Sequence, residues 1–202
     1  MRKRAPVGFD LDMTLIDSRR AVMSSFAAVA EATGTPIDPA GVDQRLGIKL
    51  EDELAHWFAP DRIPDAVAIY RAHYARVAAG LTDVLPGAPG ALAAVRAAGA
   101  RAVVITAKYG VPARAALDGT GLTADDLFTD RHGPEKADVL TEIGAAVYVG
   151  DTPADMAAAK VAGAVGVGVA TGSFGAESLM SAGADVVLPS LREFPAWYEI
   201  AL

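Results

Sequence analysis

Short, uninterrupted apolar runs recur along the chain and predict buried β-strands. Most are rich in valine and lack an alternation of polar and apolar positions, which is typical of strands covered on both faces in a parallel sheet. Helical patterns separate several of these runs, and they begin near a proline or end just before a glycine. This order predicts an α/β fold with a doubly wound parallel sheet. The predicted strands are Ala5–Asp10, Arg101–Thr106, Ala145–Asp151, Val165–Ala170 and Asp185–Leu188, and the predicted helices of the same region are Ala88–Ala98, Pro134–Ile143 and Pro153–Ala162.

One long stretch, from residue 18 to residue 81, interrupts the alternation of strands and helices because it contains helical patterns only. Ser18 stands where it could cap a first helix, and the apolar spacing within Leu50–Phe58 and Pro64–Ala78 predicts two more. We expect these helices to form a cap inserted over the sheet, with the chain returning near Thr82–Gly87. Packing of the same helices against the flank of the sheet is the alternative. The predicted division is a core of residues 1–17 and 82–202 and an all-helical cap of residues 18–81.

Composition and charge narrow the possible functions. The chain has 202 residues, no cysteine and a formal net charge of −7, which excludes a thiolate metal site or cysteine nucleophile and argues against nucleic-acid binding. The apolar run after the basic start is interrupted at Asp10, and the longest one, Val161–Ala170, is well short of the roughly 20 residues that span a bilayer. We therefore expect a cytoplasmic protein that binds no membrane. Either a monomer or a homodimer is compatible with the sequence.

Charged and hydroxyl side chains stand at the ends of three predicted strands. Asp10 ends the first, with Asp12 two residues later; Thr106 ends the second and Asp151 the third. The carboxyl ends of parallel strands lie at one edge of the sheet, where ligands of open α/β sheets bind. Lys136 opens the helix before the third strand, a position that the helix dipole disfavours by about 0.3–1 kcal/mol, so a role at this edge would explain it. Clustered carboxylates could hold a divalent cation.

The segments that carry these residues resemble the four motifs of the haloacid dehalogenase-like (HAD) superfamily. VGFDLDMTLIDS is similar to the first motif, DxDxT after an apolar strand, and VVITAK to the second, a strand that ends in Thr or Ser. Lys136 in GPEKADVL resembles the third motif, and VYVGDTPADM the fourth, GDxxxD. The motifs occur in the family's order, and the helical insertion has the position of its type 1 cap. The resemblance covers nearly the whole chain and implies a Rossmann-like core beneath a helical cap.

The resemblance also implies a reaction, phosphoryl transfer through an aspartyl-phosphate with the help of Mg²⁺. Asp10 would be the nucleophile, and Asp12 the general acid and then the general base. Thr106 would bind phosphate oxygens, and Lys136 would stabilise the charge of the nucleophile and the phosphoryl group. The Mg²⁺ ligands would be the side chains of Asp10 and Asp151 and the backbone carbonyl of Asp12.

Two further residues hold supporting positions. Thr14 matches the threonine of the first motif, and it could also fix the turn through a bond between its hydroxyl and the backbone. Asp155 matches the last acid of the fourth motif. The run from Thr152 to Asp155 predicts a capping box at the start of a helix as well, and the two roles are compatible.

Three positions depart from the family pattern. Met13 replaces the usual glycine, Ala107 replaces a frequent asparagine after the second motif, and Ala137 replaces a common proline after Lys136. None of these changes removes a chemical group that the reaction needs. They leave the substrate and the rate open.

The acid at Asp12 favours phosphate monoesters as substrates. The carbon–halogen hydrolases of the superfamily have no acid there, since a halide leaves without a proton. IDSRRAVMSSFAAVAEATG and RLGIKLEDEL resemble phosphoglycolate phosphatase-like proteins, which implies hydrolysis of a small phosphorylated metabolite. In the cap, Arg45 and Lys49 could then meet a substrate carboxylate, and a solvated position on a cap helix is the alternative for each.

Three other functions stay open at this point. A β-phosphoglucomutase resembles the same core, although the cap lacks a clear sugar-binding pattern. A non-catalytic relative that binds a phosphorylated ligand would keep the fold, and Met13 is the departure that would fit it. A phospho-accepting receiver domain also groups acids, threonine and lysine, but receivers are shorter and have no inserted cap. The sequence does not identify the metabolite.

Overall fold

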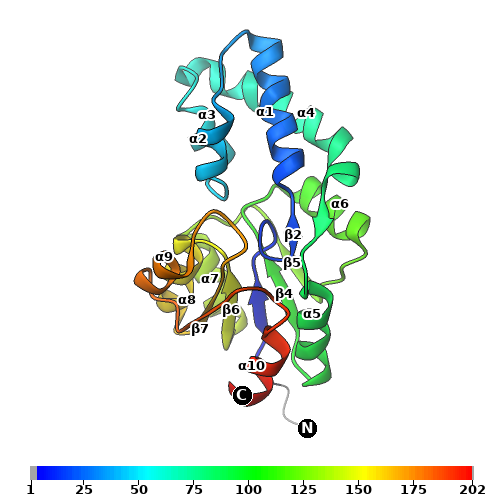
Figure 1. Ribbon diagram of the computed structural model, residues 1–202, viewed down its shortest axis with the longest axis vertical. Coiled ribbons are helices and arrows are strands. Elements are labelled where there is room, and N and C mark those ends of the chain that lie inside the picture. Colours follow the sequence, from blue (N-terminus) through cyan, green and yellow to red (C-terminus); the bar gives the residue numbers. More distant parts are fainter. Residues whose placement is uncertain (1–3, 202) are drawn as a thin grey trace.

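The computed structural model describes residues 4–201 and contains a six-stranded sheet in which every neighbouring pair is parallel (Figure 1). The strand order is β5-β4-β1-β6-β7-β8. Val7 of the central strand pairs with Ala102 on one side and with Val147 on the other. The predicted doubly wound sheet is confirmed. Its strands are β1 (Val7–Phe9), β4 (Ala102–Ile105), β5 (Asp126–Phe128), β6 (Val147–Gly150), β7 (Val165–Val169) and β8 (Val186–Leu188).

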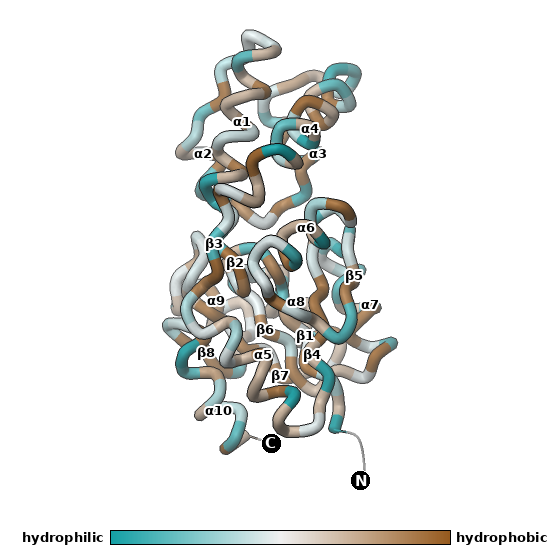
Figure 2. Tube along the Cα trace, turned by 90° about the vertical axis from the view of Figure 1, so that its right-hand side faces the viewer, coloured by the Kyte–Doolittle hydropathy of each residue, from teal (hydrophilic) through white to brown (hydrophobic). Residues whose placement is uncertain are grey.

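Helices cover both faces of this sheet. Successive residues of a strand point to opposite faces, so Val104 belongs to one hydrophobic cluster while Val103 and Tyr148 belong to the other. This double burial explains the continuous apolar runs, and the strands carry much of the brown colour in Figure 2. Within residues 4–201 no helix is both long and apolar enough to cross a membrane. One face is covered by α5 (Ala88–Ala97), α6 (Gly110–Thr120) and α10 (Phe194–Ala201), and the other by α7 (Pro134–Ile143), α8 (Pro153–Ala162) and α9 (Ala176–Ser181).

A helical region rises from the sheet on a two-stranded antiparallel ribbon, in which Ile16 pairs with Val84. We call residues 19–81 the cap. Figure 1 shows the cap at one end of the molecule and α10 at the other. The chain therefore leaves and re-enters the core through adjacent strands. The ribbon consists of β2 (Ile16–Asp17) and β3 (Asp83–Val84), and the cap of α1 (Arg19–Thr33), α2 (Pro39–Gln44), α3 (Leu50–Leu54), the 3₁₀ helix η1 (Pro60–Arg62) and α4 (Ile63–Leu81).

The cap has a hydrophobic cluster of its own. Phe26 and Val29 lie one turn apart on α1 and are buried in it, together with Leu54 and Phe58. Burial of this stripe, rather than helix propensity, is what stabilises such short helices. The inserted helical cap is confirmed as a feature of the fold. The residues at which one domain gives way to the other stay a prediction.

Several elements were not predicted. Helix α6 was missed because Pro112 and Gly119 interrupt its apolar pattern, and β5 because a three-residue edge strand gives almost no pattern. The short helices α2, α9 and α10 were missed as well. Predicted strands were also too long at their ends, as in Ala5–Asp10 against the observed Val7–Phe9. Ala5 and Pro6 continue the apolar run and Asp10 is the acid at its end, but none of the three forms a ladder pair.

Candidate active site

Asp10 and Asp151 come directly after the neighbouring strands β1 and β6. The backbone N–H of Asp10 donates to the carbonyl of Val149 at 2.8 Å, which fixes the end of β1 against β6. Both carboxylates are buried, and their oxygens lie with one of Asp155 within 4.8 Å of one another. The structure thus brings together acids that are far apart in the sequence, at the sheet edge where the topology predicts a ligand.

Lys136 balances part of this negative charge from the first turn of α7. Its Nζ lies 2.7 Å from Oδ1 of Asp10 and 2.6 Å from Oδ1 of Asp155. Burial lowers the pKa of the lysine, but the two carboxylates more than offset this and raise the pKa well above its ordinary value. An ammonium with two anionic partners can remain charged in the interior. Lys136 is therefore a fixed positive charge beside Asp10.

Asp155 supports Lys136 and has both of its oxygens occupied. Oδ1 also accepts from the hydroxyl of Tyr148 at 3.1 Å, and Oδ2 accepts from the backbone N–H and the hydroxyl of Thr152 at 3.1 and 2.6 Å. The predicted capping box at the start of α8 is present. A Cβ on Gly150 would lie 2.4 Å from Cβ of Asp155, so glycine is required there. Sequence reasoning missed Tyr148, because an aromatic residue in a buried strand has the pattern of core.

Asp10 and Asp151 differ from Asp155 because each keeps an oxygen without a hydrogen-bond donor among residues 4–201. Oδ1 of Asp151 accepts from the hydroxyl of Thr14 at 3.1 Å, and Oδ1 of Asp10 faces Lys136. Burial raises the pKa of Asp10 to about 7, although Lys136 lowers it, and burial raises the pKa of Asp151 well above its usual range. Two buried carboxylates this close favour a cation between them.

The backbone carbonyl of Asp12 offers a third oxygen, since it accepts no hydrogen bond from residues 4–201. Carboxylate and carbonyl oxygens are the ligands that Mg²⁺ prefers, with water completing an octahedron. The residues present therefore fit the predicted ion.

The turn after β1 is tight and holds Met13 in an unusual conformation. The carbonyl of Leu11 accepts the backbone N–H of Leu15 at 2.9 Å and of Ile16 at 3.0 Å. Met13 has a φ of 59°, where an L side chain costs about 1–2 kcal/mol. The usual glycine adopts this φ freely. The methionine side chain is buried, so its packing offsets part of the strain.

Thr106 lies at the end of β4, on the other side of β1. It is buried, and its backbone N–H donates to the carbonyl of Phe128 on β5 at 2.9 Å. Its hydroxyl oxygen accepts the backbone N–H of Lys108 at 3.0 Å. This bond orients the side chain and leaves the hydroxyl proton available to an incoming acceptor such as a phosphate oxygen.

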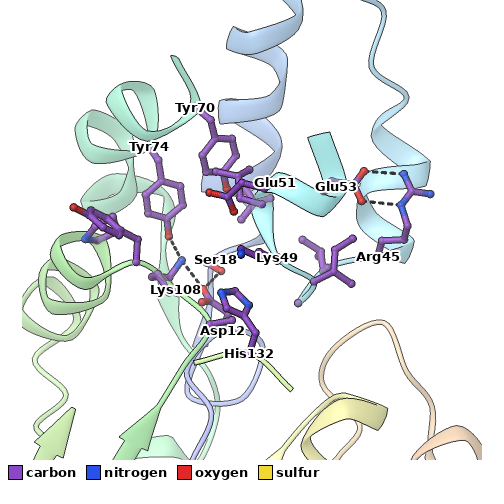
Figure 3. Close-up of a pocket in the computed structure, with 18 of the residues that line it drawn as sticks. Asp12, Ser18, Arg45, Lys49, Glu51, Glu53, Tyr70, Tyr74, Lys108 and His132 are labelled. Atoms are coloured by element: carbon purple, nitrogen blue, oxygen red, sulfur yellow. Dashed lines mark hydrogen bonds and ion pairs between the residues drawn. The ribbon is translucent and has the colours of Figure 1, made fainter. Parts of the chain in front are cut away.

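The side chain of Asp12 is held by two donors. Oδ1 accepts from the hydroxyl of Ser18 and lies 2.8 Å from Nζ of Lys108 (Figure 3). The expectation that Ser18 caps α1 is wrong in one respect. Ser18 occupies the N-cap position, but its side chain makes no capping bond, and Asp17 accepts the N–H of Arg19 at 3.0 Å instead. No sequence pattern indicated Lys108.

A cavity of about 380 Å³ separates the cap from the core, and Asp12 and Asp151 line its core side. The two predicted substrate residues differ in their surroundings. Arg45 donates from Nε and Nη2 to Glu53, both at 2.7 Å, and Glu53 is buried. Lys49 lines the cavity and has no ion pair among residues 4–201. Figure 3 shows Arg45 turned toward Glu53 at the far side of the cavity.

The remaining wall of the cap is largely apolar or already paired. Arg71 lies 3.2 Å from Glu51 and over the ring of Tyr109, 4.5 Å from its centroid. A wall of this kind excludes water from a closed site and so strengthens the electrostatic interactions inside it. Its apolar side chains are Val22, Phe26, Val42, Leu46, Ile48 and Leu50.

Comparisons with known proteins agree with this arrangement. The profile of the haloacid dehalogenase-like hydrolases matches residues 7–160. Phosphoglycolate phosphatase from Rhodospirillum rubrum is 33% identical over 214 aligned positions, which cover 94% of this chain and 88% of that protein. A plasmid-encoded phosphoglycolate phosphatase from Cupriavidus necator is 31% identical over 207 aligned positions, which cover 93% of this chain and 90% of that protein. The solved structure of a haloacid dehalogenase-like hydrolase from Streptococcus pneumoniae has a TM-score of 0.85 at 21% identity, covering 98% of this chain and 100% of that one.

Proposed function

The chain belongs to the haloacid dehalogenase-like hydrolases and is a phosphatase, and we propose that it hydrolyses a small phosphorylated metabolite with magnesium and through an aspartyl-phosphate on Asp10. One observation carries the proposal. A buried carboxylate, Asp10, lies beside a fixed ammonium, Lys136, and next to a second carboxylate, Asp151, that keeps an oxygen without a donor among residues 4–201. This group of charges suits a nucleophile, a phosphoryl group and a divalent cation together.

The proposed reaction has two steps. The Asp10 carboxylate attacks phosphorus, an O–P bond to Asp10 forms, and the bond to the leaving oxygen breaks as Asp12 gives that oxygen a proton. Asp12 then takes a proton from a water that attacks the aspartyl-phosphate, which releases phosphate and restores Asp10. Magnesium, held by Asp10, Asp151 and the carbonyl of Asp12, would reduce the repulsion between carboxylate and phosphate. Thr106 and Lys136 would bind the phosphoryl oxygens.

For the substrate we propose phosphoglycolate or a similarly small phosphate monoester that carries a carboxylate. The names of the two relatives support this class. Lys49 supports it too, as a cation on the cap side of the cavity whose charge has no carboxylate partner among residues 4–201. Arg45 would act less directly, because its guanidinium is already engaged by Glu53.

The test is phosphate release from phosphoglycolate, glycerol 3-phosphate, glucose 6-phosphate and AMP, each with Mg²⁺ and with EDTA. We expect release that depends on Mg²⁺ and is greatest with phosphoglycolate. Asp10→Asn should abolish turnover with an unchanged circular dichroism spectrum, while Asp118→Asn, a matched change at an exposed residue of α6, should keep full activity. Activity in Asp10→Asn would remove Asp10 as nucleophile. Phosphate release that is unchanged by EDTA would contradict the proposed requirement for magnesium.

The same assay separates the alternatives. An enzyme like β-phosphoglucomutase would interconvert sugar phosphates and release little free phosphate. A non-catalytic relative would release none from any ester. Free phosphate in stoichiometric yield with the alcohol is the outcome that the proposal requires.

A further inference from the structure

Lys108 lies where the core, the cap and Asp12 meet, and neither the motifs nor the relatives assign it a role. We infer that Lys108 is a positioning residue, which orients Asp12 for proton transfer and does so only while Tyr74 of the cap is docked against it. The inference rests on the proposed function, in which Asp12 carries the proton. It is built from four sets of contacts: those of the Lys108 backbone, of its ammonium, of Tyr74 and of Asp12.

The backbone of Lys108 is fixed on both sides. Its N–H donates to the hydroxyl oxygen of Thr106 at 3.0 Å, and its carbonyl accepts the N–H of Asp130 at 3.1 Å. The residue thus spans the loops that follow β4 and β5. Its side chain is only 9% exposed and enters the space between the core and the cap. The direction of the side chain is therefore set by the core.

The ammonium joins one partner from each region (Figure 3). Nζ lies 2.8 Å from Oδ1 of Asp12, 2.8 Å from the hydroxyl of Tyr74, and 4.4 Å from the centroid of the Tyr74 ring. A buried ammonium is costly unless its donors are satisfied. Asp12 supplies the opposite charge, and Tyr74 supplies both an acceptor and an aromatic face. Both partners are therefore needed to stabilise the buried ammonium of Lys108.

Tyr74 belongs to the interior of the cap and must move with it. Its side chain is buried on α4, and its ring stacks on Tyr70 with centroids 5.9 Å apart. Tyr70 packs in turn on Phe26 of α1, at 5.0 Å. Opening of the cap would therefore take the acceptor and the aromatic face away from Lys108 together.

The contacts at Asp12 show what this arrangement controls. Both donors, Ser18 and Lys108, bind the same oxygen, Oδ1. Oδ2 has no donor among residues 4–201, and Asp12 lines the cavity. Oδ2 is therefore the oxygen that exchanges a proton with the leaving group and then with water. Since a general acid must be placed within hydrogen-bond reach of its target, loss of the Lys108 contact should misplace the proton donor.

The test compares leaving groups in Lys108→Met. The kcat/KM value reports the step in which the leaving group departs. An alkoxide needs a proton from Asp12 and nitrophenolate does not. We expect kcat/KM to fall about 10²-fold for phosphoglycolate and for glycerol 3-phosphate, and less than about threefold for p-nitrophenyl phosphate. Lys108→Arg should recover part of the loss.

Tyr74→Phe tests the link to the cap. It should lower kcat/KM for the two alkyl esters about tenfold, and the double variant should be no worse than Lys108→Met alone, because Tyr74 acts through the lysine. Matched controls are Lys160→Met on α8 and Tyr198→Phe on α10, which lie outside the lining of the cavity and should change nothing.

Three kinetic results would overturn the inference. Equal losses on all three esters would mean that Lys108 only stabilises the fold. A loss confined to phosphoglycolate would mean that it binds the substrate carboxylate. Independent, additive losses in the double variant would mean that Tyr74 does not act through it.

Small-angle X-ray scattering tests the docking without any turnover. The radius of gyration should rise in Lys108→Met and Tyr74→Phe and stay unchanged in the controls. If the wild type hydrolysed none of the esters while this rise was seen, the proposed function would fail and the docking contact would stand. An unchanged radius in both variants would overturn the docking contact even in an active enzyme.

Discussion

The core and the cap both contain buried charged groups, but they use them differently. In the core, Lys136 joins Asp10 and Asp155 from elements that are far apart in the sequence, and one oxygen of Asp10 is left for chemistry. In the cap, Arg45 is satisfied by Glu53, so that charge holds cap helices together. The core gathers its charges around Asp10, the proposed nucleophile. In the cap, three ion pairs join cap residues to one another: Arg19 with Asp43, Arg45 with Glu53 and Arg71 with Glu51.

The different use of charge in the core and the cap limits which residues can recognise a substrate. Most cations of the cap wall are already paired, so few remain to meet a ligand. Contacts between the core and the cap are therefore the places to look for an effect of the cap on activity. Besides the contact of Lys108 with Tyr74, the hydroxyl of Ser173 donates to the carbonyl of Asp43 at 2.6 Å. Small changes at such points should alter activity more than similar changes within the cap.

The largest effect should come from adding one methyl group beside Asp151. A Cβ on Gly172 would lie 1.9 Å from Oδ2 of that residue, so Gly172→Ala must displace the carboxylate. We expect the Mg²⁺ concentration for half-maximal activity to rise by about 10–100-fold, as for other disturbed metal shells. Gly175→Ala is the matched control, since no atom lies within 4 Å of its added Cβ. An unchanged Mg²⁺ requirement in Gly172→Ala would remove Asp151 from the ligand set.

Removing a buried charge of the cap should lower the stability of the protein more than it lowers its turnover. In Arg45→Met the carboxylate of Glu53, which is 4% exposed, keeps one donor among residues 4–201, the indole N–H of Trp57 at 3.2 Å. Because Arg45 itself is about one-third exposed, we expect a loss of about 1–3 kcal/mol in the free energy of unfolding, measured by urea denaturation.

An exposed pair provides the contrast for that prediction. Arg20 and Asp83 are 59% and 68% exposed, so Arg20→Met should cost less than about 1 kcal/mol. Equal losses in the two variants would show that burial of Glu53 does not matter. A loss of turnover in Arg45→Met larger than its loss of stability explains would instead make Arg45 a substrate-binding residue.

The smallest effect concerns the turn that connects the core to the cap. Met13→Ala and Met13→Gly both remove the buried side chain, but only glycine relieves the positive φ. Glycine should therefore be the more stable replacement by about 1 kcal/mol, against the usual order of these residues. Thermal unfolding of the two variants measures the difference. The reverse order would mean that the backbone at Met13 is not strained.

The sequence was sufficient for those parts of the site that follow from local pattern. Valine-rich runs that end in Asp10, Thr106 and Asp151 predicted both the parallel strands and the edge where their side chains meet. Lys136 and the capping box of Asp155 were recognised by their places in the first turns of helices. The topology of the sheet then places these side chains close together, because parallel strands have their carboxyl ends at the same edge.

The contacts across the cavity could not be predicted in this way. Lys108 and Tyr74 are 34 residues apart and lie in a loop and on a helix of different regions. Nothing in the spacing of either segment indicates the other. Ser18 shows a related limit, since its position predicted a helix cap while the nearby carboxylate of Asp12 binds its hydroxyl instead. Local pattern gives a residue's element, and its tertiary partner decides its role.

The central claim, that Asp10 carries the phosphoryl group, can be tested directly. The enzyme is mixed with Mg²⁺ and phosphoglycolate, quenched in acid within its first turnovers, and treated with borohydride, which reduces an aspartyl-phosphate to homoserine. Peptide mass spectrometry should find homoserine at position 10, and none in Asp10→Asn or without substrate. Phosphate release with an unmodified Asp10, or with homoserine at another aspartate, would contradict the account.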